Sequence, residues 1–214
     1  AGFFDFLSGG CAFERAVLES RLPELSIMPS GQYDACARRG FSAHDIPARM
    51  GDLLRSAELR GVECLVMDTA AGLTGLTEAV VKASDYVVIP QQAEPLAVRS
   101  LPHLLETLAR FRSEGAAVKV AGILLTMVMS GEGMSLQGAR EVRQLLPQDL
   151  LFKQSIPRMA TFLEASALGV PVALLKRNPP PEALLFEQVA AELEERIGLI
   201  REREASQRHA SLLD

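Results

Sequence analysis

The sequence predicts an α/β protein with a doubly wound, mainly parallel sheet flanked by helices. Two apolar runs, Cys64 to Met67 and Val118 to Thr126, lack the period-2 alternation of half-exposed strands, which indicates strands covered on both faces. Other stretches, such as His44 to Leu59, carry apolar residues at helical spacing. Strands and helices that alternate along a chain are typical of a parallel sheet with helices wound on both sides.

The first half of the chain is expected to hold a short helix from Ala12 to Glu19, a strand around Leu25 to Met28, and the helix from His44 to Leu59. The later elements continue the alternation. In order, they are a helix over 73–82, a strand over 86–89 ended by Pro90, a helix from Glu94 to Gly115, a strand over 118–126, a loop over 127–134, a helix over 135–146, a strand over 150–156, a short helix at 164–165, a strand over 170–175, a proline break at 178–181 and a long helix over 186–200.

Length and composition set the broad class. A chain of 214 residues with 48% hydrophobic and 23% charged residues predicts one globular domain over residues 1–200 and a charged tail over 201–214. The net charge of -5 gives no general reason to expect nucleic acid, although a local basic face remains possible. The odd count of three cysteines favours reduced, buried structural thiols. No apolar run is long enough to predict a membrane span, and no basic-then-apolar leader predicts secretion.

The stretch from Glu63 to Gly72 organises the functional prediction, because its apolar run ends in a carboxylate, a hydroxyl and a glycine. Ligands of open α/β sheets bind beyond the carboxyl ends of the strands, where Asp68 is expected. An ionised carboxylate there suits a magnesium ion carried by a nucleotide, and the Gly72 backbone can approach a phosphate closely. The competing interpretation is that Asp68 only caps the helix that follows.

Six stretches with a common order and spacing carry a resemblance to a known family. They are LSIMPSG at 25–31, VMDT at 66–69, DYVVIPQQAEPLA at 85–97, GILLTM at 122–127, IPR at 156–158 and EASALGVPV at 164–172. Together they resemble the ParA/Soj-type partitioning ATPases within the MinD-like group of deviant P-loop proteins. Each stretch is weak alone, and the resemblance covers nearly the whole chain up to about Leu175.

The resemblance implies a P-loop NTPase-like fold that uses ATP and Mg²⁺. It implies that Asp68 is the Walker B acid, which holds Mg²⁺ through water. It also implies that Thr69 to Gly72 begin the switch that senses the γ-phosphate. Relatives usually carry prolines where this chain has Ala70 and Ala71, which leaves this switch less stiff.

The resemblance further implies that the loop starting at Thr126 and Met127 and the turn at Pro157 and Arg158 flank the adenine. Both follow expected strand ends and would lie on the same edge of the sheet as Asp68. Each segment also has a structural interpretation that stays open. Pro157-Arg158 is then a tight surface turn with a solvated charge, and Thr126-Met127 is then only the start of a loop.

The largest departure from the family is at the front of the chain. Relatives begin with a strand, a glycine-rich loop bearing two lysines, a helix and a second strand that ends in an acid. No G-x-x-x-x-G-K-[ST] motif occurs in the 214 residues, so this chain alone is not expected to hydrolyse ATP. We therefore expect the fold to lack its first βαβ unit here, and the chain to be part of a longer ATPase rather than a natural protein without that unit.

The resemblance implies a nucleotide-switched homodimer that binds DNA without sequence preference and positions DNA or another cargo, with a ParB-type activator as partner. It would be cytoplasmic and associated with the nucleoid, without a membrane role. The candidate phosphate contacts share a basic side chain near the later helices and strand ends; they are Arg140, Arg143, Lys153, Lys176 and Arg177. Solvated surface charge is the alternative role for each of them.

Two other functions remain open at this point. A MinD-like membrane-associated ATPase would carry a C-terminal amphipathic helix, for which Leu212 and Leu213 give only a weak apolar stripe. A non-hydrolysing scaffold or adaptor would keep the fold without the phosphate loop.

Overall fold

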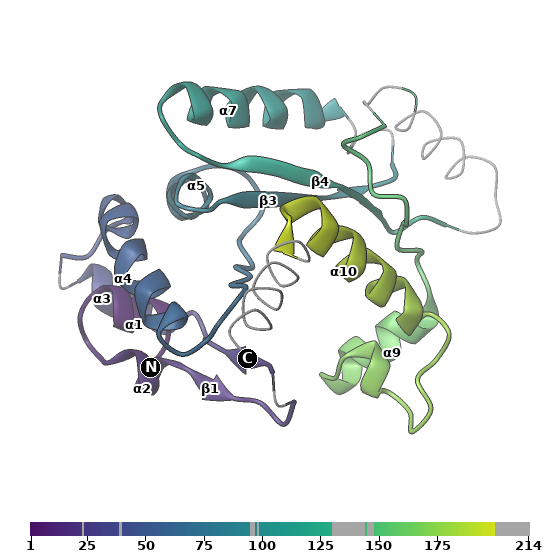
Figure 1. Cartoon of the computed structure of the whole chain (residues 1–214), viewed down its shortest axis with the longest axis horizontal. Helices are drawn as coiled ribbons and strands as arrows, with labels where there is room; N and C mark the ends of the chain where they lie inside the picture. Colours follow the sequence, from purple (N-terminus) through teal and green to yellow (C-terminus); the bar gives the residue numbers. More distant parts are fainter. Residues whose placement is uncertain are drawn as a thin grey trace, which may run out of the picture. The chain divides into compact units, whose positions relative to one another are not determined.

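The computed structural model describes residues 1–22, 24–38, 40–94, 97, 99–129, 144 and 148–199. Figure 1 shows their helices and strands. In chain order these are α1 (Phe3–Leu7), α2 (Phe13–Ala16), β1 (Leu18–Glu19), β2 (Ser26–Ile27), α3 (Tyr33–Ala37), the 3-10 helix η1 (Ala43–Asp45), α4 (Ile46–Glu58), α5 (Gly75–Lys82), β3 (Tyr86–Gln92), α7 (Leu101–Ser113), β4 (Lys119–Thr126), α9 (Ala160–Leu168), the 3-10 helix η2 (Val172–Leu174) and α10 (Ala183–Ile197). The expected helix over 135–146 and the tail over 201–214 lie largely or wholly outside the described residues.

The chain divides into two compact units. Unit 1 comprises Ala1–Ser84 and Ala109–Val118, and unit 2 comprises Asp85–Leu108 and Lys119–Asp214. The expectation of one domain over residues 1–200 stays a prediction.

Unit 1 is built around α4, which confirms the helix predicted for His44 to Leu59. Its side chains at Ile46, Met50, Leu53 and Ala57 recur three or four positions apart and are buried in one apolar cluster. The cluster also takes in residues of α1, α2 and α5. Leu54, which the pattern places on the same stripe, is exposed instead.

Two short elements before α4 differ from the prediction. The helix expected from Ala12 to Glu19 ends at Ala16 as α2, and Leu18–Glu19 forms β1. β1 pairs antiparallel with β2, which is the strand predicted around Leu25 to Met28. Val17, the residue after α2, has an extended backbone (φ -96°, ψ 139°), so the helix cannot continue into this hairpin.

A charged cluster joins α5 to the end of α7 within unit 1. The Lys82 ammonium donates a hydrogen bond of 2.8 Å to Glu114, forms an ion pair with Glu78 at 2.8 Å, and lies 4.6 Å from the centre of the Phe111 ring. The hydrogen bond to Glu114, followed by that to Glu78, raises the pKa of Lys82, and the same Lys82 bond lowers the pKa of Glu114. The two helix ends are therefore held by charge as well as by apolar contact.

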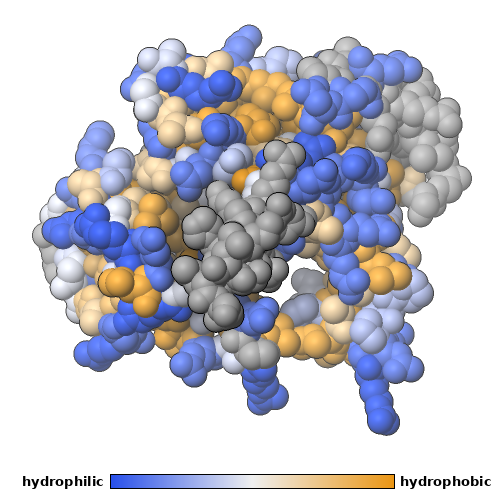
Figure 2. All heavy atoms as spheres, in the orientation of Figure 1, coloured by the Kyte–Doolittle hydropathy of each residue, from blue (hydrophilic) through white to orange (hydrophobic). Residues whose placement is uncertain are grey.

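The strand predicted to end at Asp68 is not formed as a paired strand. Among the described residues, no ladder includes 62–70, and most of this stretch is exposed, with Val66 at 81%. Met67 is the exception, because it packs against the apolar cluster of unit 1. Figure 2 shows that apolar side chains, in orange, remain on the visible surface. A strand needs a neighbour to satisfy its backbone groups, so an apolar run alone does not establish a paired strand.

Unit 2 contains the parallel strands that the sequence predicts. β3 and β4 pair in parallel over seven residue pairs, from Tyr86 opposite Lys119 to Gln92 opposite Thr126. β3 continues through Pro90, where the sequence predicts its end. Among the described residues β3 pairs only with β4, so the missing N–H of Pro90 can face an unpaired edge.

The strand predicted over 150–156 is present only in part. Parallel bridges join Ile123 to Leu151 and Val128 to Pro157, so the segment from 150 to 158 lies beside β4. Between these bridges the residues have no regular ladder. Unit 2 thus holds three chain segments running in the same direction, which confirms a parallel α/β arrangement flanked by helices (Figure 1).

Helix ends in the second half of the chain follow the expected signals, with one error. α7 ends at Ser113, and the left-handed Gly115 (φ 98°) follows it, with the Ala116 N–H bonded to the Phe111 carbonyl in a Schellman cap. α9 confirms the short helix predicted around 164–165. The strand predicted over 170–175 is wrong: Pro171 leads into η2 instead, because the Pro171 carbonyl accepts the N–H of Leu174 and closes a helical turn.

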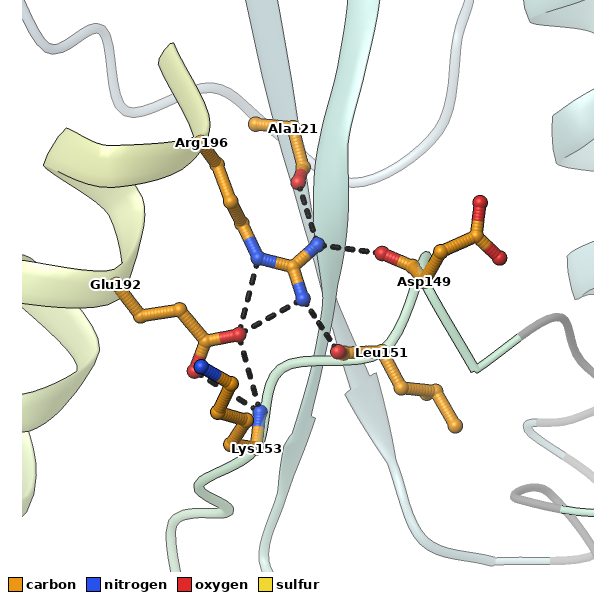
Figure 3. A network of polar contacts seen from close by, with 6 residues as sticks. All are labelled: Ala121, Asp149, Leu151, Lys153, Glu192 and Arg196. Carbon is orange, nitrogen blue, oxygen red and sulfur yellow. Dashed lines mark hydrogen bonds and ion pairs between the residues drawn. The ribbon is translucent and has the colours of Figure 1, made fainter. Parts of the chain in front are cut away.

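α10 confirms the long helix but contacts β4 in an unexpected way. Phe186, which the pattern places on the apolar stripe, is 45% exposed, whereas Glu192 is only 8% exposed. Figure 3 shows Glu192 and Arg196 reaching from α10 toward β4 and the segment that follows Asp149. The Arg196 guanidinium lies 4.7 Å from the centre of the Phe152 ring. Polar side chains therefore make the central contact of this helix.

Gly122 in β4 leaves the space that this contact needs. A Cβ at Gly122 would lie 2.8 Å from Cε2 of Phe152 and 2.9 Å from Nη1 of Arg196. We expect Gly122→Ala to lower the free energy of unfolding by about 1–3 kcal/mol, because the buried ring and guanidinium would have to move. In α4 a Cβ at Gly51 would meet only Nη1 of Arg55, at 3.5 Å. Gly51→Ala should therefore raise the free energy of unfolding by about 1 kcal/mol.

Urea denaturation of the two variants beside the unchanged protein measures both effects. Equal shifts for Gly122→Ala and Gly51→Ala would contradict the close approach at Gly122.

Candidate functional site

The first group of candidate residues, Asp68, Thr69 and Gly72, lies in unit 1. Met67 is held by the apolar cluster immediately before it. On the other side, the buried Thr77 hydroxyl of α5 donates a 3.2 Å hydrogen bond to the Ala70 carbonyl. Gly72 has φ 91°, a conformation that residues with a Cβ rarely adopt. The loop from Asp68 to Gly72 is thus anchored just before its start, at Met67, and in its middle, at Ala70.

The structure decides between the two interpretations of Asp68 in one respect. α5 begins at Gly75 with Thr74 as its N-cap and has no side-chain cap hydrogen bond, so Asp68 does not cap the helix. The Asp68 carboxylate is exposed and makes no hydrogen bond or ion pair within the described part of the chain. A free hard-oxygen donor of this kind fits Mg²⁺ held directly or through water. The magnesium role of Asp68 stays a prediction.

The second group, Thr126, Met127, Pro157 and Arg158, lies in unit 2, where the structure brings all four together. The Arg158 N–H donates to the Val128 carbonyl at 2.9 Å, so the turn runs directly beside the loop after β4. Met127 has φ 55°, which makes it the one described non-glycine residue in the left-handed region. Strained backbone of this kind is concentrated at functional sites. The two segments thus lie side by side, as the sequence predicts, whereas their predicted place on the same edge as Asp68 stays a prediction.

Sequence analysis missed two polar residues at the same edge. Gln91 is buried at the end of β3, and its amide nitrogen donates a 3.0 Å hydrogen bond to the Gln92 carbonyl. Gln92 is opposite Thr126, and the Ala93 N–H bonds to the Thr126 carbonyl at 3.2 Å. The sequence feature that could have indicated them is the pair of glutamines directly after an apolar run, since polar residues at strand ends of parallel sheets tend to face ligands. Gln91 and Gln92 belong with the second group.

The basic candidates are only partly described. Lys153, Lys176 and Arg177 are exposed and make no ion pair with described residues, whereas Arg140 and Arg143 lie outside the described residues. Lys153 follows Phe152, and Lys176 and Arg177 follow η2. Their accessibility leaves them able to contact phosphates.

The three cysteines differ in their exposure. Cys36 is buried as expected, but Cys11 is partly exposed and Cys64 is exposed, so a structural role in the core holds for Cys36 alone. Within the described residues, no group of three or more His, Cys, Asp or Glu side chains could hold a metal ion. None of the described helices combines the length and apolar character that crossing a bilayer requires.

Comparisons with known proteins agree with the geometry. The chain is 32% identical over 111 residues to the sporulation initiation inhibitor protein Soj of Bacillus subtilis, which covers 51% of this chain and 44% of Soj. It is 30% identical over 127 residues to the chromosome partitioning protein ParA of Myxococcus xanthus, covering 59% of this chain and 44% of ParA. The chain thus spans about half the length of these relatives. No protein-family model matches it.

Solved structures share the fold at low sequence identity. The septum site-determining protein MinD of Pyrococcus horikoshii, complexed with Mg-ADP, aligns with a TM-score of 0.70 and 17% identity over 93% of this chain and 75% of MinD. An ATP complex of a McdA variant from Cyanothece aligns with a TM-score of 0.66 and 18% identity over 92% of this chain and 75% of McdA. The chain is therefore similar in sequence to Soj and ParA over about half of their length, and it shares the fold of the MinD and McdA structures.

Proposed function

We propose that the protein acts as a ParA-like, ATP-dependent switch that positions DNA or another cargo. The observation that carries this proposal is the edge of unit 2, where the loop after β4 and the Pro157-Arg158 turn lie side by side in a chain of the ParA/MinD fold. Two proteins with that fold were solved with ATP or with Mg-ADP. Adenine nucleotide and Mg²⁺ are therefore the ligands that we propose for this chain.

Each group of candidate residues has a proposed role. The Asp68 carboxylate would hold Mg²⁺ through water, and Thr69 to Gly72 would respond to the terminal phosphate. Thr126, Met127, Pro157 and Arg158 would flank the adenine from both sides, with the left-handed Met127 shaping the loop. Bound Mg²⁺ would neutralise phosphate charge. Phosphate binding by a lysine-bearing loop is not proposed for these 214 residues, which contain no such motif.

The proposed switch acts through assembly. ATP binding would join two copies of the protein, and the dimer would hold DNA by phosphate contacts without reading bases. Arg140, Arg143, Lys153, Lys176 and Arg177 are the proposed contacts. An activator of ParB type would stimulate release. This protein would work in the cytoplasm, on the nucleoid.

Asp68 gives the first test, in the full natural protein. We expect Asp68→Ala to weaken ATP binding about tenfold or more in Mg²⁺, because a residue that holds the metal through water typically contributes that much. The difference should vanish when EDTA replaces Mg²⁺. Asp34→Ala, which changes an exposed aspartate of α3, is the matched control. Calorimetric titration with ATP measures both, and equal affinities for the two variants in Mg²⁺ would rule out the metal role.

The basic residues give the second test. Charge reversal of Arg143 together with Lys176 should weaken binding to arbitrary duplex DNA and reduce the salt slope of the affinity by about two, one for each phosphate that is no longer neutralised. Reversal of Arg21 together with Arg38, two exposed arginines of unit 1, is the control. Filter binding over a series of salt concentrations gives the slope. An unchanged slope in the first pair would refute the DNA assignment.

The same preparations separate the rival functions. Co-sedimentation with liposomes of anionic lipid in place of DNA would indicate a membrane-associated ATPase of the MinD kind. Absence of any ATP binding by the full natural protein would indicate a scaffold or adaptor.

A further inference from the structure

The segment from 150 to 158 departs from a regular strand at one place. The Ile123 carbonyl of β4 accepts the Phe152 N–H at 3.0 Å, and the Leu125 carbonyl accepts the Ile156 N–H at 2.8 Å. The two acceptors are two residues apart, but the two donors are four residues apart. A regular parallel ladder spaces acceptors and donors equally. The chain between Phe152 and Ile156 therefore makes an excursion away from β4 that is two residues longer than the ladder needs.

Glu192 of α10 holds the start of this excursion, as Figure 3 shows. The Lys153 N–H points away from β4 and donates to both carboxylate oxygens of Glu192, at 2.9 and 3.2 Å. The carboxylate is 8% exposed, so its charge needs compensation. Arg196 supplies it with two hydrogen bonds to Oε1, at 3.0 Å from Nε and 2.7 Å from Nη2. The start of the excursion is thus held by an ion pair whose carboxylate is buried and whose guanidinium is partly buried.

Arg196 fastens the residues before the excursion as well. Its Nη2 donates to the Leu151 carbonyl at 2.5 Å, and its Nη1 donates to the carbonyls of Asp149 and Ala121, at 2.8 and 3.0 Å. Ala121 belongs to β4, so one guanidinium joins α10, β4 and the neighbouring segment. These hydrogen bonds of the Arg196 guanidinium fix the register of the segment relative to β4.

The residues after the excursion are those of the candidate site. The Ile156 carbonyl accepts the Val128 N–H at 3.2 Å, and the Val128 carbonyl accepts the Arg158 N–H at 2.9 Å. A slip of one residue in the excursion would change these partners and turn the following side chains to the other face. The position of the turn beside the loop after β4 therefore depends on where the excursion begins.

We propose that Glu192 and Arg196 are positioning residues for the Pro157-Arg158 turn, acting through the Lys153 backbone. The pair sets the register of residues 156–158 against Val128 and so sets the geometry of the base-binding edge. The part of this inference that concerns the base rests on the proposed nucleotide function. Because the turn is proposed to flank the adenine, we expect the Glu192–Arg196 pair to control binding of an adenine ring and not binding of the phosphates.

Amide hydrogen exchange tests the positioning without any nucleotide. In Glu192→Gln the side-chain oxygen can still accept from Arg196 and, at 3.2 Å, from the Lys153 N–H, but an NH₂ group replaces the oxygen that accepts the shorter 2.9 Å bond from Lys153. We expect exchange at the Val128 and Arg158 amides to accelerate about tenfold or more, as for a locally released segment. Glu195→Gln, an exposed neutralisation on the same helix, is the control.

Two results would overturn the positioning role. One is unchanged exchange at Val128 and Arg158 in Glu192→Gln. The other is equal acceleration throughout, including the amides of α4 in unit 1, which would indicate general destabilisation. Arg196→Lys is the milder second variant: it keeps the charge but cannot reach three carbonyls and a carboxylate at once, so the same amides should accelerate.

Binding of ATP and of inorganic tripolyphosphate, both in Mg²⁺ and with the full natural protein, tests the consequence for the base. We expect Glu192→Gln to weaken ATP binding about tenfold through the displaced turn and to leave tripolyphosphate binding unchanged. An equal decrease in affinity for both ligands would contradict the assignment. If the unchanged protein binds neither ligand, the proposed nucleotide function fails, and the exchange experiment alone decides the positioning role.

Discussion

The ion pair of the buried Glu192 with the partly buried Arg196 is the interaction on which the arrangement of unit 2 depends. The segment beside β4 leaves carbonyls and an N–H that no further strand satisfies among the described residues. The pair satisfies them from α10 with a fork of charge-assisted hydrogen bonds. A side-chain pair thus takes the place of a neighbouring strand at this point. The pair also needs a glycine in β4, because the absence of a side chain at Gly122 leaves room for the guanidinium and the Phe152 ring.

This dependence explains why α10 is predictable as a helix but not in its contacts. Apolar residues at helical spacing identify a helix, and the helix forms. The same pattern assigns Phe186 to the buried face, yet the most buried side chain in the middle of the helix is the carboxylate of Glu192. A hydropathy pattern does not predict the burial of a charged side chain when backbone groups distant in the sequence supply its hydrogen bonds. Only the positions of Leu151 and Lys153 in space show that burial is possible.

The same distinction separates the other correct and incorrect predictions. The strand over 118–126 and the helix around α4 are long and strongly patterned, and both are confirmed. The short apolar run before Asp68 has the residues of a buried strand, but pairing depends on neighbours, and the described residues include no ladder for it. The strand over 170–175 fails because a local turn after Pro171 overrides β-branched residues. The candidate site is predictable where it follows strand ends, whereas Gln91 and Thr77 become visible only through their burial and hydrogen bonds.

The central claim is that the edge formed by the loop after β4 and the Pro157-Arg158 turn receives an adenine ring. Photolabelling of the full natural protein with 8-azido-ATP in Mg²⁺, followed by identification of the labelled peptides by mass spectrometry, tests it most directly. The account predicts that the label lies within residues 126–129 or 156–159, where Met127 and Arg158 lie on adjacent chain segments, and that excess ATP abolishes it. Label confined to other peptides, or label that excess ATP does not compete away, would contradict it.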